Sequence, residues 1–357
     1  MKIKKYCGAI IALAMMSGNV MAADVAIDGV KLDGNTVTIS GTAEKADEMV
    51  TMVLRNSETN ELMRVAQMKT DSEKTYKIVF DMPESFKGNN TDGEYTVTVN
   101  LSKSGGEKDT GNFKYVRESV RSEILGVIQS GDSAFITETL KAVDVCADAL
   151  NIEGINGDRL MALGDDAFSG VFESALEGKD AASVDYPDIA SDINRYIAFY
   201  ELNDGTNVQG NLTELNPVFE EKAFNDMSED EKEYIAAAVE KKVPVADLAE
   251  FQTSYDEISV LCKLNFARYS QLDKLMKTYE TVIGLDTADA YDDYNDLSSA
   301  KKQKVQEGIV DELETKVYTF EDFIEILDDE VKAASKKTST GGGGGGGGND
   351  DFLDMES

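Results

Sequence analysis

Five aspartates lie close together in the stretch GLDTADAYDDYNDL of this 357-residue chain. Carboxylate oxygens are ligands that Ca²⁺ prefers in proteins. The stretch lacks the alternating spacing, the central glycine and the terminal glutamate of an EF-hand loop. We therefore expect either a calcium site here or a solvated acidic connection that caps helix N-termini. The candidate ligands are Asp286, Asp289, Asp292, Asp293 and Asp296.

Histidine and tryptophan are absent from the sequence. The lack of imidazole excludes serine and cysteine triads with a histidine base, and it excludes zinc held by histidine. Carboxylate pairs could still act in a glycan hydrolase, but with 68 acidic residues some pair always has a suitable separation, so their abundance is uninformative. We expect a noncatalytic protein that needs no cofactor, unless the aspartates bind Ca²⁺.

Two cysteines, Cys146 and Cys262, lie on apolar helical faces, and Cys7 lies near the N-terminus. A disulfide between Cys146 and Cys262 would need Cα atoms within about 7 Å of each other, which a sequence cannot show. The sequence thus leaves pairing open and favours buried free thiols that behave as small hydrophobic side chains.

The chain is strongly acidic, with 68 Asp and Glu against 35 Lys and Arg and a formal charge of -33. A surface of this charge repels phosphate groups, so nucleic acid and anionic membrane surfaces are not expected partners. It also keeps an exposed protein soluble.

Residues 1–22 have the pattern of a secretory signal peptide. Three lysines precede an apolar run, AIIALAMM, that is too short to span a bilayer, and Val20 and Ala22 stand at the spacing of a cleavage site. No later run reaches 18 uninterrupted apolar residues. We therefore expect a secreted protein with no membrane span in the mature chain.

Residues 23–116 predict an Ig-like antiparallel β-sandwich. Short runs rich in Val, Thr, Tyr and Ile are separated by clusters of Gly, Asn, Asp and Ser. In GEYTVTVNL, apolar Val97 and Val99 alternate with Thr96 and Thr98, which indicates a sheet with one buried face. The cysteines and tryptophan of antibody domains are missing, so only the general architecture is expected.

Residues 117–335 predict an all-α region of about three helical repeats, with possible boundaries near 204 and 266. The stretch SEDEKEYIAAAV aligns with SSAKKQKVQEGI 70 residues later, and VADLAEFQTSY aligns with TFEDFIEILDD about 72 residues later. Apolar residues at helical spacing, such as Phe323, Leu327 and Val331, mark buried helix faces. Such repeats gain stability by packing on their neighbours.

Residues 336–348 end in eight glycines and predict a flexible linker. A phosphate-binding loop would need Lys and Ser or Thr directly after the glycines, whereas Asn and Asp follow here. Residues 349–357 then open a further segment, in which Phe352, Asp354 and Met355 form a Phe-x-Asp-hydrophobic pattern.

With these parts in order, the chain resembles cell-surface proteins of Gram-positive, clostridia-like bacteria that carry S-layer homology modules. The Phe-x-Asp opening and the stretches FEDFIEIL and GLD support the resemblance. It implies that residues 349–357 are the truncated start of an S-layer homology module, and that a downstream region binds a cell-wall polymer. It transfers no site residue to this chain, because none of the known binding residues falls within it.

The resemblance implies a noncatalytic structural and interaction protein displayed on the bacterial cell wall. The alternative is an adhesin that binds a polysaccharide or a protein through the β-sandwich, because Ig-like folds host such sites without proving them. A secreted hydrolase is the third alternative.

Overall fold

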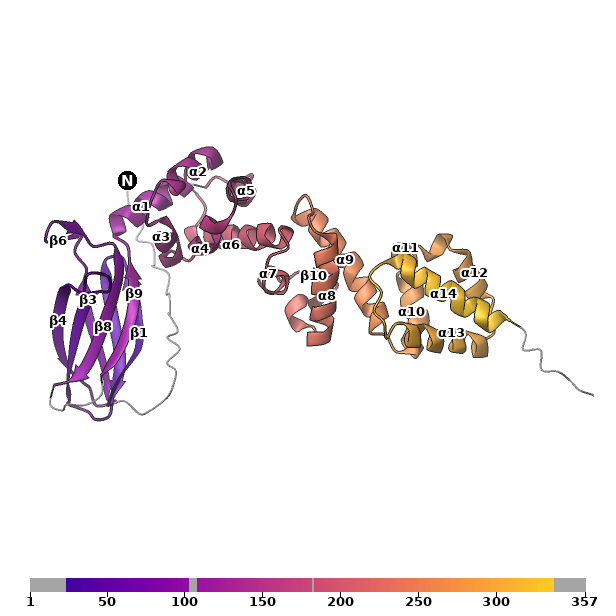
Figure 1. Cartoon of the computed structure of the whole chain (residues 1–357), viewed down its shortest axis with the longest axis horizontal. Coiled ribbons are helices and arrows are strands. Elements are labelled where there is room, and N and C mark those ends of the chain that lie inside the picture. The colour runs from indigo at the N-terminus through magenta and orange to yellow at the C-terminus, as the bar shows by residue number, and fades with distance from the viewer. Residues whose placement is uncertain (1–23, 103–107, 182, 337–357) are drawn as a thin grey trace, which may run out of the picture. The chain divides into compact units, whose positions relative to one another are not determined.

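The computed structural model describes residues 24–102, 108–181 and 183–336 (Figure 1). The predicted signal peptide, the glycine run and the S-layer homology-like segment lie outside the described residues. The chain divides into two compact units between Leu215 and Asn216. Each unit is described by itself.

The N-terminal unit begins with a β-sandwich of two antiparallel sheets. One sheet has the strand order β1-β2-β5 and the other β4-β3-β8-β9, while β6 and β7 form a separate hairpin. The strands are β1 (Val25–Asp33), β2 (Thr36–Ala43), β3 (Met49–Asn56), β4 (Leu62–Lys69), β5 (Thr75–Asp81), β6 (Ser85–Phe86), β7 (Asn89–Asn90), β8 (Gly93–Leu101) and β9 (Asp109–Tyr115). The predicted antiparallel β-sandwich is confirmed.

The alternation of apolar and polar residues along the strands determines which side chains form the core of the sandwich. Ile39 on β2, Met52 on β3 and Val97 on β8 have no exposed surface, so apolar side chains of both sheets meet in one cluster. Thr96 and Thr98 are half-buried and alternate with the buried residues of β8, as the pattern of the sequence predicts. Burial of these side chains is the main favourable contribution to folding of the sandwich.

Tyr95 makes a tyrosine corner at the start of β8. Its hydroxyl donates a hydrogen bond of 2.8 Å to the backbone carbonyl of Thr91, four residues earlier, and its ring stacks on that of Phe113 at 5.7 Å. A tyrosine bonded in this way is a hallmark of Ig-like sandwiches and fixes the corner before the strand.

Fourteen α-helices follow within the described residues. Those of the N-terminal unit are α1 (Glu118–Ile128), α2 (Ser133–Lys141), α3 (Cys146–Ile152), α4 (Gly157–Ala162), α5 (Asp165–Leu176), α6 (Tyr186–Asn203) and α7 (Val208–Leu215). Those of the C-terminal unit are α8 (Glu229–Lys242), α9 (Leu248–Asn265), α10 (Tyr269–Thr278), α11 (Glu280–Ile283), α12 (Asp289–Asn295), α13 (Ser299–Glu312) and α14 (Phe320–Ser335). The C-terminal unit also contains the hairpin β10 (Val218–Phe219) and β11 (Lys222–Ala223) and two 3₁₀ turns, η1 (Phe224–Asp226) and η2 (Leu285–Thr287).

The C-terminal unit contains two helical hairpins at the predicted offset. Helices α8 and α13 are both 14 residues long and begin 70 positions apart (299 - 229 = 70). The paired positions Ile235 and Val305 are both fully buried, while Ser228 caps α8 in a capping box with Glu231. The predicted boundaries near 204 and 266 coincide with the ends of α6 and α9, whereas the division into compact units falls later, at 215/216.

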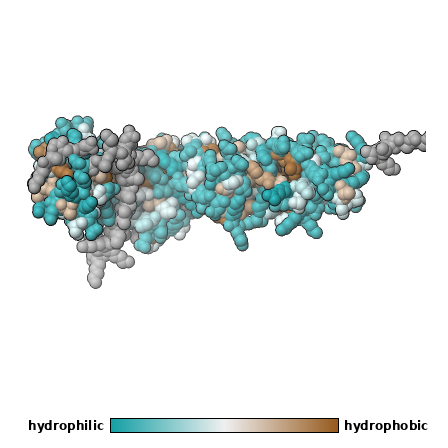
Figure 2. Space-filling view, turned by 90° about the horizontal axis from the view of Figure 1, so that it is seen from below, coloured by the Kyte–Doolittle hydropathy of each residue, from teal (hydrophilic) through white to brown (hydrophobic). Residues whose placement is uncertain are grey.

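The surface agrees with the composition. Figure 2 shows one face that is mostly hydrophilic and carries only small, separate apolar patches. Within the described residues, no helix is both long and apolar enough to cross a membrane.

The tyrosine corner predicts a defined loss of stability. Replacing Tyr95→Phe should lower the free energy of unfolding by about 1–3 kcal/mol, because the Thr91 carbonyl loses its partner in a buried environment. Urea unfolding followed by circular dichroism measures the change. Tyr269→Phe, at a side chain that is 44% exposed, is the matched control. Equal stabilities of the two variants would contradict a structural role for the corner.

Candidate functional site

The sandwich and the first helices meet at a joint centred on Arg121 of α1. This side chain is only 7% exposed, and it donates hydrogen bonds to the carbonyls of Gly34 (2.7 Å) and Val116 (3.0 Å). It also forms an ion pair with Glu153, which follows α3. Because a buried guanidinium must have all its donors satisfied, these three partners fix how the sandwich meets α1 and α3.

Gly34 forms the turn between β1 and β2 at this joint. Its φ of +59° is a backbone conformation that L side chains rarely adopt, and a Cβ there would lie 3.3 Å from Oε2 of Glu118. Glycine therefore lets the turn approach α1 closely and present its carbonyl to Arg121.

A second set of polar contacts surrounds the joint. Arg117 Nε pairs with Asp92 at 2.9 Å, and Tyr115 donates a hydrogen bond of 2.6 Å to the Asn35 side chain. Ser119 donates a hydrogen bond of 2.7 Å to Glu84, which lowers the pKa of that carboxyl below its ordinary value. Contacts from the sandwich thus reach several residues of the first turn of α1.

A groove with a volume of about 410 Å³ lies beside the joint, where β1, β8 and β9 meet α3 and α4. Its apolar part includes Phe113, which is 6% exposed, and its polar rim includes an ion pair of 2.6 Å between Lys114 and Asp148. The hydrogen bond to Asp148 raises the pKa of Lys114. We call this the junction groove; its lining residues are Val30, Leu32, Glu94, Asn112, Phe113, Lys114, Asp148, Asn151, Ile152 and Asp158.

The junction groove has the chemistry of a binding site. Pockets for ligands are commonly 300–1,000 Å³ in volume, largely apolar, and placed where domains meet. Its rim carries three carboxylates and one lysine, and Asp148 already pairs with that lysine. Glu94 and Asp158 are exposed, so the groove suits a ligand that combines an apolar group with a positive charge.

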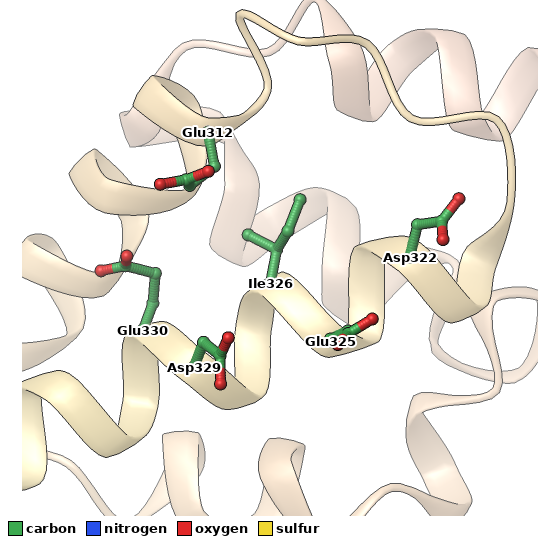
Figure 3. Close-up of a pocket in the computed structure, with 6 residues that line it drawn as sticks. All are labelled: Glu312, Asp322, Glu325, Ile326, Asp329 and Glu330. Carbon is green, nitrogen blue, oxygen red and sulfur yellow. The ribbon is translucent and has the colours of Figure 1, made fainter.

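An acidic hollow of about 300 Å³ lies in the C-terminal unit between α13 and α14 (Figure 3). Burial, together with nearby Glu312, Asp311 and Asp329, raises the pKa of Glu330. Figure 3 shows carboxylates spread along α14, with that of Glu312 on α13, and they point in different directions. Across the part of the chain that the structure describes, no group of three or more potential ligands could hold a metal ion.

The predicted calcium ligands lie at separate positions along a short helix. Asp286 is in η2, Asp289 begins α12, and Asp296 follows its last residue. The buried face of α12 consists of Ala290, Tyr291 and Tyr294, which leaves Asp292 and Asp293 exposed to solvent. The structure does not bring these carboxylates together in the described residues, and the calcium site stays a prediction.

The described cysteines, Cys146 and Cys262, are both free and buried. Burial raises the pKa of the Cys146 thiol to about 11 and that of Cys262 to about 12. Since the thiolate is the reactive form, both side chains act as apolar groups in their cores.

The sequence analysis missed the joint and the junction groove. One signal was present, because Arg121 stands in the apolar stripe that also contains Ile124 and Ile128. A charged residue on a buried helix face predicts a buried partner. The groove has no such signal, because its residues come together only when β9 packs against α3.

A scan against models of protein families finds no match for this chain, and a search of curated proteins finds no relative.

The buried thiols predict slow chemical modification. In the native protein at pH 8, iodoacetamide should leave Cys146 and Cys262 unmodified, because both pKa values lie well above this pH. In denaturant both should react rapidly, and mass spectrometry of the two peptides measures the labelling. Rapid labelling of the native protein would contradict the burial, and resistance in denaturant without reductant would reveal a disulfide.

Proposed function

We propose that this chain is a noncatalytic structural and interaction protein of a bacterial cell surface. It is secreted through the predicted signal peptide and is held at the cell wall by an S-layer homology region that follows the glycine run. The order of these segments in the sequence supports the attachment, and the acidic composition suits an exposed surface.

The joint at Arg121 is the observation that carries the proposal. Its hydrogen bonds and ion pair tie the sandwich to α1 and α3, and further polar contacts join the sandwich to the first turn of α1. A buried charged side chain with several partners specifies one arrangement of the elements it joins. A sandwich held firmly on a helical support is suited to display, because the displayed module keeps its orientation on that support.

The junction groove favours a second candidate function, an adhesin. Its apolar floor and excess of carboxylates suit an apolar, positively charged segment of a protein better than a neutral polysaccharide. This candidate keeps the same cellular location and adds a ligand.

Cell fractionation tests the location. In the native host, the protein should be recovered with the cell wall, and protease added to intact cells should remove it while a cytoplasmic marker survives. Release by a reagent that strips wall polymers should match that of a known wall-attached protein. Recovery in the cytoplasm, or protection from external protease, would overturn the proposal.

Peptide and glycan arrays test the junction groove. The intact protein should bind peptides that combine basic and apolar residues, and Ile152→Glu should weaken this binding about tenfold or more by placing a charge in the apolar floor. Val79→Glu, at an exposed position away from the groove, should leave it unchanged. Saturable glycan binding that Ile152→Glu does not alter would place the ligand elsewhere and reject the groove.

A further inference from the structure

The junction groove already holds a positive charge that belongs to the protein itself. Nζ of Lys114, on β9, donates a hydrogen bond of 2.6 Å to Oδ1 of Asp148, on α3, so this ion pair bridges the sandwich and the helices. The side chain of Lys114 is 52% exposed. An ion pair with this much contact with solvent contributes little to stability, so the lysine can leave the carboxylate at small cost.

Three carboxylates of the groove surround this lysine. Asp148 accepts its hydrogen bond, and Glu94 is the residue directly opposite Lys114 in the register of β8 and β9. Asp158 lies in the first turn of α4 and lines the same groove. The hydrogen bond to Asp148, and then the charges of Asp158 and Glu94, raise the pKa of Lys114 above its ordinary value. The lysine therefore lies in a cation subsite that keeps an excess of negative charge.

The contact between α3 and α4 holds two of these carboxylates in place. Asn151 donates a hydrogen bond of 2.8 Å to Asp158, and its Oδ1 accepts one of 2.8 Å from the N–H of Gly157. Gly157 lets the two helices approach closely, because a Cβ at this position would lie 2.2 Å from the carbonyl oxygen of Ala147. Their neighbours in the chain are Asp158 and Asp148. Carboxylates that are fixed in advance lose less freedom when they bind a cation.

A guanidinium group suits this subsite better than an ammonium group. An ammonium is a compact point charge, whereas a guanidinium is planar and has five N–H donors that bond carboxylates in pairs. The three carboxylates come from β8, α3 and α4, so they offer acceptors on different sides of one guanidinium. Leu32 and Ile152, both half-buried in the groove lining, can cover the apolar part of an arginine side chain and its apolar neighbours.

Lys114 competes with any ligand cation for Asp148. Because the lysine belongs to the same chain, its effective concentration at this carboxylate is on the order of millimolar. A second ammonium would replace one hydrogen bond by an equal one, whereas a guanidinium adds hydrogen bonds that the lysine does not make. The internal competitor thus favours arginine over lysine in a ligand.

We propose that the junction groove binds an arginine-containing apolar segment of a partner protein, and that the guanidinium takes the place of Lys114 Nζ at Asp148. In the complex, the lysine side chain turns to solvent and the carboxylates bond the arginine. This inference rests on the adhesin function proposed above for the groove, and it names the residue that selects the ligand.

Three acetylated peptide amides test the preference for arginine: Leu-Arg-Leu, Leu-Lys-Leu and Leu-citrulline-Leu. Citrulline has the shape of arginine and no charge. Isothermal titration calorimetry with the intact protein should show that the arginine peptide binds about tenfold or more tightly than either of the others, because each of them loses charge-assisted hydrogen bonds.

Variants of Lys114 test the competition. Lys114→Met removes the internal cation and should tighten the arginine peptide about tenfold, and the lysine peptide by more. Lys114→Arg keeps the charge and should weaken the arginine peptide, because the internal competitor is then a guanidinium as well. Asp148→Asn should weaken it about tenfold or more. Lys77→Met on β5 makes the same change in net charge as Lys114→Met and should leave all affinities unchanged.

Nuclear magnetic resonance of the lysine ammonium groups follows the exchange directly. The hydrogen bond to Asp148 slows the exchange of the Lys114 ammonium protons with water, so their signal should be visible in the free protein. It should disappear when the arginine peptide saturates the groove. A signal that persists in the saturated complex would reject the exchange, even though the peptide binds.

The outcomes separate this inference from the function on which it rests. Equal affinities of the arginine and citrulline peptides would overturn it, and so would a Lys114→Met protein, folded by circular dichroism, that binds the arginine peptide no more tightly than the original. If the original protein binds basic apolar peptides in either case, the groove keeps its proposed function. If no peptide binds the original protein or Lys114→Met, the function and the inference both fail.

Discussion

The arrangement of the N-terminal unit depends on one buried cation. Arg121 donates hydrogen bonds to one carbonyl in the β1–β2 turn and to another at the end of the sandwich. It also forms an ion pair with a carboxylate in the chain after α3. Removing any of these partners would leave a buried charge insufficiently satisfied, a cost of several kcal/mol in proteins. The contacts of Arg117, Tyr115 and Ser119 add further bonds between the sandwich and α1. They support the same orientation of the sandwich on α1 that the hydrogen bonds of the Arg121 guanidinium set.

This joint gives the two sides of the sandwich different roles. The side that carries β9 is committed to the helices and forms the junction groove with α3 and α4. The opposite side keeps an open strand edge with apolar side chains and a basic strand.

The sequence predicted those features that depend on local periodicity. Alternation in β8 and the stripe of Phe323, Leu327 and Val331 in α14 each reflect burial of one face, and the structure buries these side chains. The offset of 70 residues between α8 and α13 was readable because both helices keep apolar residues at equivalent positions. The joint and the junction groove depend on contacts between residues distant in the chain, such as Gly34 with Arg121, and no local pattern encodes these contacts. The aspartates near α12 are close in sequence but spread along a short helix in the described residues, because helical geometry turns successive side chains in different directions.

A distance measurement between the sandwich and the helices tests the rigid joint most directly. Spin labels at Lys77→Cys on β5 and Asp166→Cys on α5 occupy exposed positions of the same unit, while the native Cys146 and Cys262 are buried. Double electron–electron resonance should give one narrow distribution in the original protein and in Arg159→Ala, which breaks ion pairs only among the helices. Arg121→Ala should broaden it. A broad distribution in the original protein, or a narrow one that persists in folded Arg121→Ala, would contradict a sandwich held in place by this buried arginine.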